Sequence, residues 1–246
     1  MNSINIIQGE NPLDLLKRCS GYYERPPAGP LVGYAGRDEA GKQYVGMVYV
    51  NFAMAERHGI VLKHIALETF IKFPEIARNG DGFCAAPEGG KALAVALATH
   101  LGKDYIFPEK EIIALKTEHS REKSRLIWGR HEPKPREKWW IVEDVCNNFS
   151  TTTEMIGLTE NCGATVVGII CFLNRSFSHV INYTAPNGVR LPIHALVSRT
   201  IAEYSQDDPV VATDIAAGNI VWKPKNEWAR LEAAMSRDRL VRLINQ

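Results

Sequence analysis

Hydrophobic and polar positions along the chain follow a pattern that predicts strands separated by helices. Residues 44–52 (YVGMVYVNF) are rich in β-branched and aromatic side chains, which indicates a strand. In residues 58–73 apolar side chains recur at the spacing of one helical face, which indicates a helix. Residues 165–173 (TVVGIICFL) predict a strand that is apolar enough to be buried on both faces, as in a parallel sheet.

The alternation continues between these segments. The pattern predicts further short strands, and helices that open after Gly90 and at Ser150. Strands alternating with helices predict an α/β fold with a mostly parallel central sheet flanked by helices. We expect five parallel strands in this sheet. The predicted strands are 82–86, 105–107, 111–115 and 139–142, and the predicted helices are 92–101 and 150–161.

The two ends of the chain differ from this middle part. We expect residues 1–57 to form a small N-terminal hood, residues 58–205 the core, and residues 206–246 an extension whose helix packs on the core. In the tail, 193–204 has the pattern of an amphipathic helix, 212–224 of an extended connection and 227–244 of a helix with a charged face.

Composition narrows the class of protein. Of 246 residues, 45% are hydrophobic and 23% charged, and the net charge is +1, which is ordinary for a globular protein and does not favour nucleic acid or a membrane as partner. No apolar run is long enough to span a bilayer, and the N-terminus has no signal-peptide pattern. Because the five cysteines lack CxxC spacing, we expect free thiols and a cytoplasmic protein.

The most informative segment is 139–156, WWIVEDVCNNFSTTTEMI. An apolar strand ends in two adjacent carboxylates, Glu143 and Asp144, and ligands of open α/β sheets bind at such strand ends. Four hydroxyl residues, Ser150 to Thr153, then open a helix, whose first N–H groups and dipole favour a phosphate. This spacing places acidic residues for sugar hydroxyls or hydrated magnesium shortly before a phosphate cradle.

Two other interpretations fit the same spacing. Serine and threonine at a helix start are commonly N-caps. An acidic pair at a strand end also occurs in α/β proteins that bind magnesium for other purposes, such as phosphohydrolases. That chemistry usually has a second aspartate two residues after the nucleophilic one, and position 146 is Cys.

This segment resembles the phosphoribosyl-pyrophosphate motif of type I phosphoribosyltransferases. The strand, Glu143–Asp144–Val145 and Ser150–Thr151 agree with the motif. The loop departs from it, because the family usually has Thr at position 147 and Gly at position 149, where this chain has Asn and Phe. The resemblance implies that Asn147, Asn148, Ser150, Thr151 and Thr152 bind the phosphoribosyl group. It also implies that Glu143 and Asp144 act in catalysis and bind Mg²⁺, through water.

The resemblance extends along most of the chain. Residues 82–98 (GFCAAPEGGKALAVALA) are similar to the family's first strand, loop and helix, which implies that Glu88, Gly89, Gly90 and Lys91 contact pyrophosphate. Taken alone, this glycine pair fits a tight strand-to-helix turn equally well. Lys110 and Glu111 match an Arg-Lys-Glu sequence of the orotate enzymes, which implies a catalytic Lys110. The family's next segment is a mobile loop, often reaching a neighbouring subunit; here it contains Lys116, His119, Arg121 and Lys123. A solvated basic loop is the alternative.

Two further matches point to the orotate branch. Arg175 corresponds to a family arginine that contacts the carboxylate of the base, and Arg37 lies in a segment similar to one that holds substrate. The resemblance therefore implies transfer of ribose 5-phosphate from phosphoribosyl pyrophosphate to a nucleobase, with orotate first among the bases and pyrimidine nucleotide biosynthesis as the context. It also implies a homodimer. The alternatives are a non-catalytic ligand sensor and an enzyme for another base.

Overall fold

The computed structural model describes residues 4–114, 123–176 and 181–244 of the 246-residue chain, and these form two units. The central unit comprises His58–Arg199, and the terminal unit comprises Met1–Arg57 together with Thr200–Gln246. We expected the C-terminal extension to pack on the core. That packing stays a prediction; within the terminal unit, the strand and the helix of the extension contact residues of the first 57.

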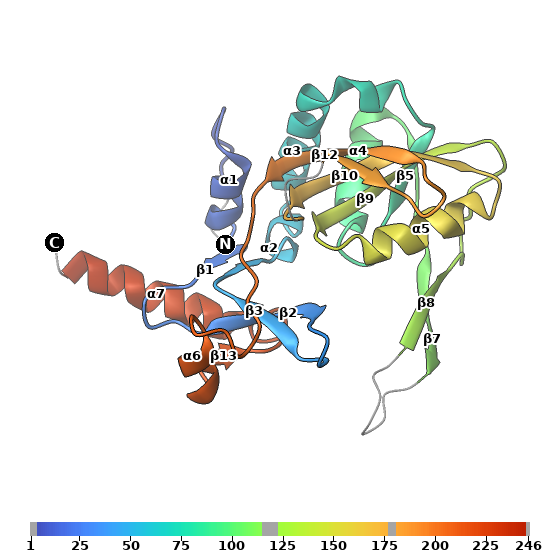
Figure 1. Cartoon of the computed structure of the whole chain (residues 1–246). Helices are drawn as coiled ribbons and strands as arrows, with labels where there is room; N and C mark the ends of the chain where they lie inside the picture. Colours follow the sequence, from blue (N-terminus) through green and yellow to red (C-terminus); the bar gives the residue numbers. More distant parts are fainter. Residues whose placement is uncertain (1–3, 115–122, 177–180, 245–246) are drawn as a thin grey trace. The chain divides into compact units, whose positions relative to one another are not determined.

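Among the described residues, six strands form the sheet of the central unit, in the order β11-β12-β10-β9-β5-β6 (Figure 1). The five strands from β12 to β6 are parallel, and β11 is antiparallel to β12. The mostly parallel sheet expected from the sequence is therefore confirmed. The strands are β5 (Gly82–Ala85), β6 (Asp104–Ile106), β9 (Lys138–Cys146), β10 (Thr165–Asn174), β11 (Asn182–Thr184) and β12 (Arg190–Ser198).

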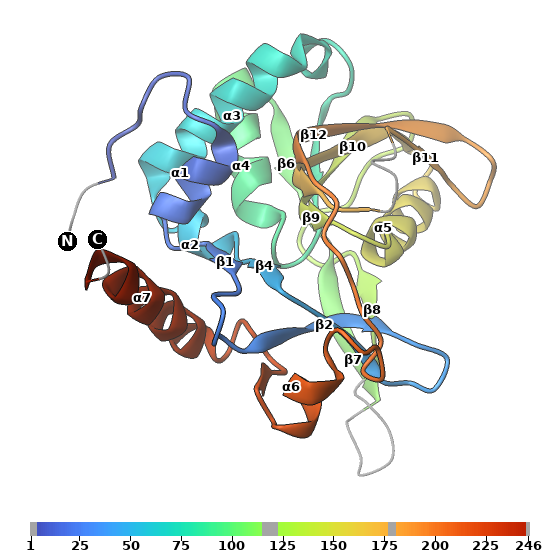
Figure 2. The same ribbon diagram turned by 60° about the vertical axis from the view of Figure 1, so that its left-hand side comes forward.

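Helices lie against both faces of this sheet (Figures 1 and 2). Helices α3 (Gly59–Lys72) and α4 (Lys91–Leu101) pack on one face, and α5 (Ser150–Glu160) packs on the other. The short helix η1 (Pro74–Ala77) follows α3 along the chain. Alternate residues of β9 serve the two faces, as the period of a strand requires. Trp139 and Ile141 belong to the core beneath α5, whereas Trp140 contacts His194.

The helix predicted over residues 193–204 is wrong, because this segment forms most of β12. Its apolar residues fit a helical spacing, but Leu191, Ile193 and Ala195 also alternate, and all three are buried in the core beneath α5. Strand β12 pairs with β10 on one side and with β11 on the other. The sheet decides the conformation here, since pairing with β10 satisfies backbone groups that would otherwise be buried without partners.

Residues 109–114 and 123–127 form a separate hairpin of strands β7 (Glu109–Ala114) and β8 (Lys123–Ile127). The expected strand at 111–115 is thus real but does not join the central sheet. Lys123, which the resemblance assigned to a mobile loop, instead begins β8. In the same strand Leu126 is buried, and its amide donates a 2.7 Å hydrogen bond to Glu154 of α5. This contact fastens the hairpin to α5.

The terminal unit combines both ends of the chain. Strand β13 (Ile220–Val221) lies parallel to β2 (Leu31–Arg37), which is antiparallel to β3 (Gln43–Gly46). Residues 212–224 are therefore only partly extended, since they also contain a short helix. The remaining elements are α1 (Pro12–Arg18), β1 (Tyr22–Glu24), β4 (Val48–Val50), α2 (Ala53–Glu56), α6 (Ala212–Ala216) and α7 (Trp228–Ile244).

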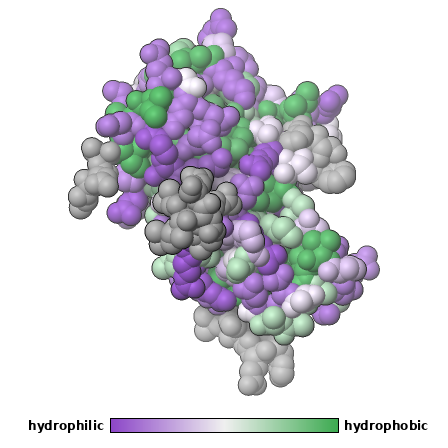
Figure 3. Space-filling model, turned by 90° about the vertical axis from the view of Figure 1, so that its left-hand side faces the viewer, coloured by the Kyte–Doolittle hydropathy of each residue, from purple (hydrophilic) through white to green (hydrophobic). Residues whose placement is uncertain are grey.

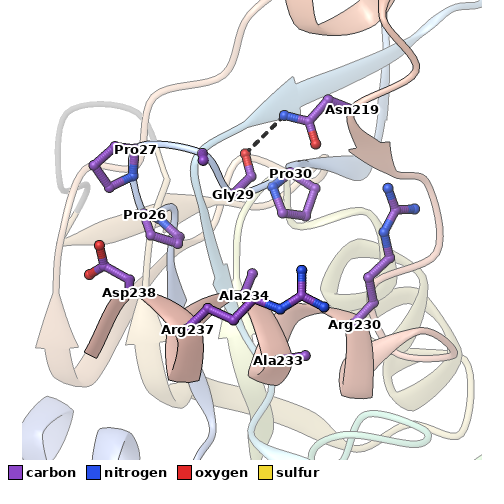
Figure 4. Close-up of a pocket in the computed structure, with 11 residues that line it drawn as sticks. Pro26, Pro27, Gly29, Pro30, Asn219, Arg230, Ala233, Ala234, Arg237 and Asp238 are labelled. Atoms are coloured by element: carbon purple, nitrogen blue, oxygen red, sulfur yellow. Dashed lines mark hydrogen bonds between the residues drawn. The ribbon is translucent and has the colours of Figure 1, made fainter. Parts of the chain in front are cut away.

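A pocket of about 670 Å³ lies in the terminal unit between the loop 26–30 and helix α7 (Figure 4). Hydrogen bonds fix the loop: the Gly29 carbonyl accepts from Arg25 and Asn219, and the Pro30 carbonyl accepts from Tyr23. The proline rings thus form a rigid wall opposite the α7 residues Arg230, Ala233, Ala234 and Arg237.

Among the described residues on the face shown in Figure 3, hydrophobic residues form small groups among hydrophilic ones. Exposed apolar side chains on α3 include Ile60, Leu67 and Ile71. Within the described part of the chain, no helix is both long and apolar enough to cross a membrane.

Candidate functional site

Two strand-to-helix connections open at the same edge of the central sheet. Strands β5 and β9 are parallel neighbours, with Ala85 paired to Val142, so their carboxyl ends meet there. Strand β5 leads into α4 and strand β9 into α5, and neither helix has a side-chain cap on its N-cap residue, Gly90 or Phe149. Because helix N-termini present unpaired N–H groups and a positive dipole end, this edge favours anions.

The loop 86–90 lies directly on the end of β9. The amide of Ala86 donates to the Val142 carbonyl (2.8 Å), and the amide of Gly90 donates to the Ala86 carbonyl (2.9 Å). A Cβ on Gly90 would lie 2.1 Å from the Val142 oxygen, and a Cβ on Gly89 2.4 Å from the Asp144 carboxyl carbon. Residue 90 therefore requires glycine, because the atoms it would meet are backbone, whereas a Cβ at residue 89 would displace the Asp144 carboxylate. The Pro87–Glu88 peptide bond is cis.

The two charged residues of this loop pair with each other. Lys91 Nζ lies 2.7 Å from Glu88 Oε2 and 4.4 Å from the centre of the Phe107 ring. The Glu88 side chain is 75% exposed and therefore accessible to solvent. Such exposed pairs contribute little to stability, so Lys91 can exchange this partner for a ligand anion at small cost.

Glu143 and Asp144 lie near the carboxyl end of β9, and both are partly buried. The Asp144 carboxylate accepts a 2.9 Å hydrogen bond from the Val145 amide and abuts Gly89. Magnesium commonly uses one or two carboxylates, with substrate phosphates and waters completing its shell. This pair fits that requirement. The described residues contain no group of three or more His, Cys, Asp or Glu side chains that could hold a metal by themselves.

The connection from β9 to α5 has an unusual backbone at Phe149, the residue that stands where the family has glycine. Its φ is 57° and its ψ 17°, in the left-handed region. The chain thus keeps the conformation that glycine adopts readily, with a bulky residue in its place. The Phe149 ring lies against the core beneath α5 and 5.1 Å from the Tyr183 ring, centre to centre.

The residues predicted to hold the phosphate have two roles: one pair caps the start of α5, and the next two residues offer amide donors. The Asn148 side-chain oxygen accepts from the amide (3.2 Å) and the hydroxyl (3.0 Å) of Ser150, which caps the helix start. Thr152 is buried, with 1% of its surface exposed, and Thr151 is half-buried. The amides of Thr151 and Thr152 lie in the first turn of α5, where no intrahelical acceptor is available. These two amides are the natural donors to an anion.

Arg175 follows directly on β10, beside the end of β9. Its amide donates to the Cys146 carbonyl at 2.9 Å, and β10 pairs with β9 up to Asn174 and Cys146. The structure therefore brings Arg175 to the same sheet edge as the acidic pair. Asn174 is buried and accepts from the amide and hydroxyl of Ser176.

The other predicted residues belong to other elements. Arg37 belongs to the terminal unit and donates to the Gly41 carbonyl. Lys110 is exposed on β7, next to the Glu111–Arg125 ion pair of the hairpin (2.6 Å). Lys123 begins β8. The predictions for Lys116, His119 and Arg121 lie outside the described residues.

Sequence reasoning missed the contacts of Thr153 and Tyr183. The Thr153 hydroxyl lies 2.7 Å from the Phe149 carbonyl and 2.5 Å from the Tyr183 hydroxyl. Phenylalanine at a glycine position was the available signal, because a bulky residue there needs packing partners. The sequence did not show that β11 supplies them.

Comparison with solved structures identifies the same architecture. The chain is similar to orotate phosphoribosyltransferase from Aeropyrum pernix, with a TM-score of 0.53 and 14% identity over 83% of this chain and 98% of that one. It is also similar to Leishmania donovani UMP synthase (TM-score 0.51, 15% identity), matching 92% of this chain but only 42% of that longer one. A third neighbour is adenine phosphoribosyltransferase from Trypanosoma brucei, solved with AMP, pyrophosphate and ribose 5-phosphate (TM-score 0.50, 14% identity, 80% and 87% covered).

No protein-family model matches the sequence, and no curated protein matches it significantly. The likeness is therefore one of three-dimensional structure, and it agrees with the sheet order and the two strand-to-helix connections described above. The chain has the type I phosphoribosyltransferase fold.

Proposed function

We propose that this protein transfers the ribose 5-phosphate group of phosphoribosyl pyrophosphate to a nucleobase and releases pyrophosphate. The observation that carries this proposal is the contact between Gly89 and the Asp144 carboxylate. This contact brings the glycine loop that precedes α4 next to the acidic pair that precedes α5. A ribose 5-phosphate with a pyrophosphate group needs these two anion-binding places with carboxylates between them.

Each part of the site has a role in this proposal. The first-turn amides of α5, with Thr151 and Thr152, hold the 5-phosphate. Glu143 and Asp144 bind the ribose hydroxyls and hold Mg²⁺, which neutralises charge on the pyrophosphate. The loop 87–90 and the N-terminus of α4 face the pyrophosphate, with Lys91 as a cation beside it. Fixed donors of this kind stabilise charge on the departing group.

Orotate is the base that we propose first. Arg175 lies at the sheet edge beside Cys146, and its guanidinium offers a partner for the carboxylate of the base. The likeness to adenine enzymes as well as orotate enzymes supports a second candidate, a purine as acceptor. With orotate, the protein would act in pyrimidine nucleotide biosynthesis, which we propose takes place in the cytoplasm.

The test is an assay of the full chain with phosphoribosyl pyrophosphate, Mg²⁺ and a panel of nucleobases. Chromatography detects the nucleotide, and a coupled assay detects pyrophosphate. We expect one base to give both products in equal amounts, and Asp144→Asn to lower the rate about a hundredfold or more, as for other groups that stabilise developing charge. Binding without products in every case would favour the non-catalytic sensor. If the protein neither binds phosphoribosyl pyrophosphate nor forms products with any base, the proposal is refuted.

A further inference from the structure

Tyr183 of β11 contacts the connection between β9 and α5 in two ways. Its ring lies 5.1 Å from the Phe149 ring at an angle of 35°, and its hydroxyl lies 2.5 Å from Thr153 Oγ1. Both rings also pack on the core beneath α5. Figures 1 and 2 show the β11–β12 hairpin next to α5. A residue thirty positions further along the chain therefore supports the start of this helix.

The direction of the hydrogen bonds follows from chemistry. Thr153 Oγ1 lies 2.7 Å from the Phe149 carbonyl oxygen, which can only accept. The threonine hydroxyl has one hydrogen, and it is used in this bond. The Tyr183 hydroxyl must then donate to Thr153. The resulting chain of two hydrogen bonds ends on the residue whose φ is positive.

This support has a reason in the sequence. Glycine adopts a left-handed conformation readily, whereas a residue with a Cβ does so only when its surroundings hold it there. Phe149 has that conformation at the N-cap of α5. Its backbone angles determine where the amides of the first helical turn point. The ring contact of Tyr183 acts on Phe149 directly, and its hydrogen bond acts through Thr153, whose hydroxyl donates to the Phe149 carbonyl.

We propose that Tyr183 is a positioning residue for the anion-binding start of α5. It holds Phe149 in its left-handed conformation and thereby aims the amides of Thr151 and Thr152. In this chain, Tyr183 and Phe149 together replace the family's glycine. The nature of the ligand rests on the proposed function, but the support of the helix start does not.

A double-mutant cycle tests this inference with phosphoribosyl pyrophosphate and Mg²⁺ in a titration calorimeter. Tyr183→Leu should weaken binding about tenfold, whereas in a Phe149→Gly background the same change should cost about threefold or less. Glycine needs no ring contact to keep the backbone angles. Tyr183→Phe keeps the ring, so its loss of affinity should lie between those of the wild type and Tyr183→Leu. This variant replaces Tyr183→Leu in the cycle if Tyr183→Leu does not fold. Val189→Ala, an exposed residue before β12, is the control and should change nothing.

Two further readouts separate positioning from general destabilisation. The KM for phosphoribosyl pyrophosphate should rise more than kcat falls in Tyr183→Leu. Hydrogen exchange of the Thr153 amide, which donates to the Phe149 carbonyl at 2.8 Å, should become faster without ligand in this variant but not in Val189→Ala. Unchanged exchange, or equal losses of binding in both backgrounds, would overturn the inference. A wild-type protein that does not bind phosphoribosyl pyrophosphate would refute the proposed function instead, and the exchange result would still decide the role of Tyr183.

Discussion

The carboxylate of Asp144 occupies the space where a side chain of residue 89 would lie. A Cβ on Gly89 would be 2.4 Å from Asp144 Cγ, and within 2.5 Å of both carboxylate oxygens. Real Cβ atoms do not approach other atoms so closely, so a side chain at residue 89 would force the Asp144 carboxylate to move. The observed position of the carboxylate beside the loop therefore depends on glycine at residue 89.

Replacing Gly89 with Ala should consequently displace the Asp144 carboxylate. We expect the affinity for phosphoribosyl pyrophosphate with Mg²⁺ to fall about tenfold or more in titration calorimetry, since at least one charge-assisted contact is lost. Gly59→Ala is the matched control, because a Cβ there meets no atom within 4 Å. Equal affinity of the two variants would contradict the role given to this contact.

Removal of the two hydroxyls at the start of α5 should weaken binding of the 5-phosphate. Hydrogen bonds to a charged group contribute roughly 1.5–3 kcal/mol each, so Thr151→Ala with Thr152→Ala should reduce affinity about tenfold or more. Thr165→Ala, at an exposed position beginning β10, controls for the loss of a hydroxyl as such. Calorimetry showing unchanged affinity in the double variant would mean that this helix start does not bind the ligand.

His194 should make the central unit less stable in acid. It stacks on Phe73 (4.5 Å), and burial lowers the pKa of its imidazole despite Glu75, whose carboxylate 3.1 Å away acts in the opposite direction. The unfolded chain then binds a proton more readily than the folded one. The contribution of His194 to the free energy of unfolding is complete above its pKa in the unfolded chain, about 6.5. It is lost as the pH falls toward the lower pKa in the folded protein.

Urea unfolding followed by tryptophan fluorescence measures this effect. Wild-type stability should decrease as the pH falls below about 6.5, and His194→Gln should flatten that part of the profile. His131→Gln changes an exposed histidine and should leave the profile as in the wild type. A wild-type profile that stays level in this range would contradict the assignment.

The thiols should differ in reactivity. Cys19, Cys84, Cys146 and Cys171 are buried, and only Cys162 is partly exposed. Burial raises the pKa of Cys84 to about 12, and the hydrogen bond with Cys171, together with burial, raises that of Cys146. Because the thiolate is the reactive form, a disulfide reagent should label one thiol quickly in the native protein and five after unfolding. Cys162→Ser should abolish the fast reaction.

We predict a homodimer, since the resemblance implies a loop that reaches a neighbouring active site. Light scattering at micromolar concentration should give about twice the chain mass of 27.5 kDa. A single species at the chain mass would contradict this. Addition of phosphoribosyl pyrophosphate with Mg²⁺ should favour the dimer if the site is shared, because ligands stabilise the state that binds them.

The sequence by itself determined the class of fold, together with the strand end and the helix start at which the candidate site residues lie. Strands β5, β9 and β10 have apolar runs that only a sheet covered on both faces can bury, and glycines 89 and 90 open a helix directly after one of them. The acidic pair and the hydroxyl residues lie close together in the chain, so their spacing already indicated a strand end and a helix start. Local pattern suffices for such features.

Features that depend on distant residues were decided by the tertiary structure alone. Residues 190–198 have apolar positions that fit a helix or a strand, and the free edge of β10 selects the strand. Phe149 contacts Tyr183 of β11, and Gly89 contacts Asp144, which lies 55 positions further along the chain. Side-chain packing and strand pairing join residues whose separation along the chain carries no local signal, so these contacts exist only once the sheet has formed.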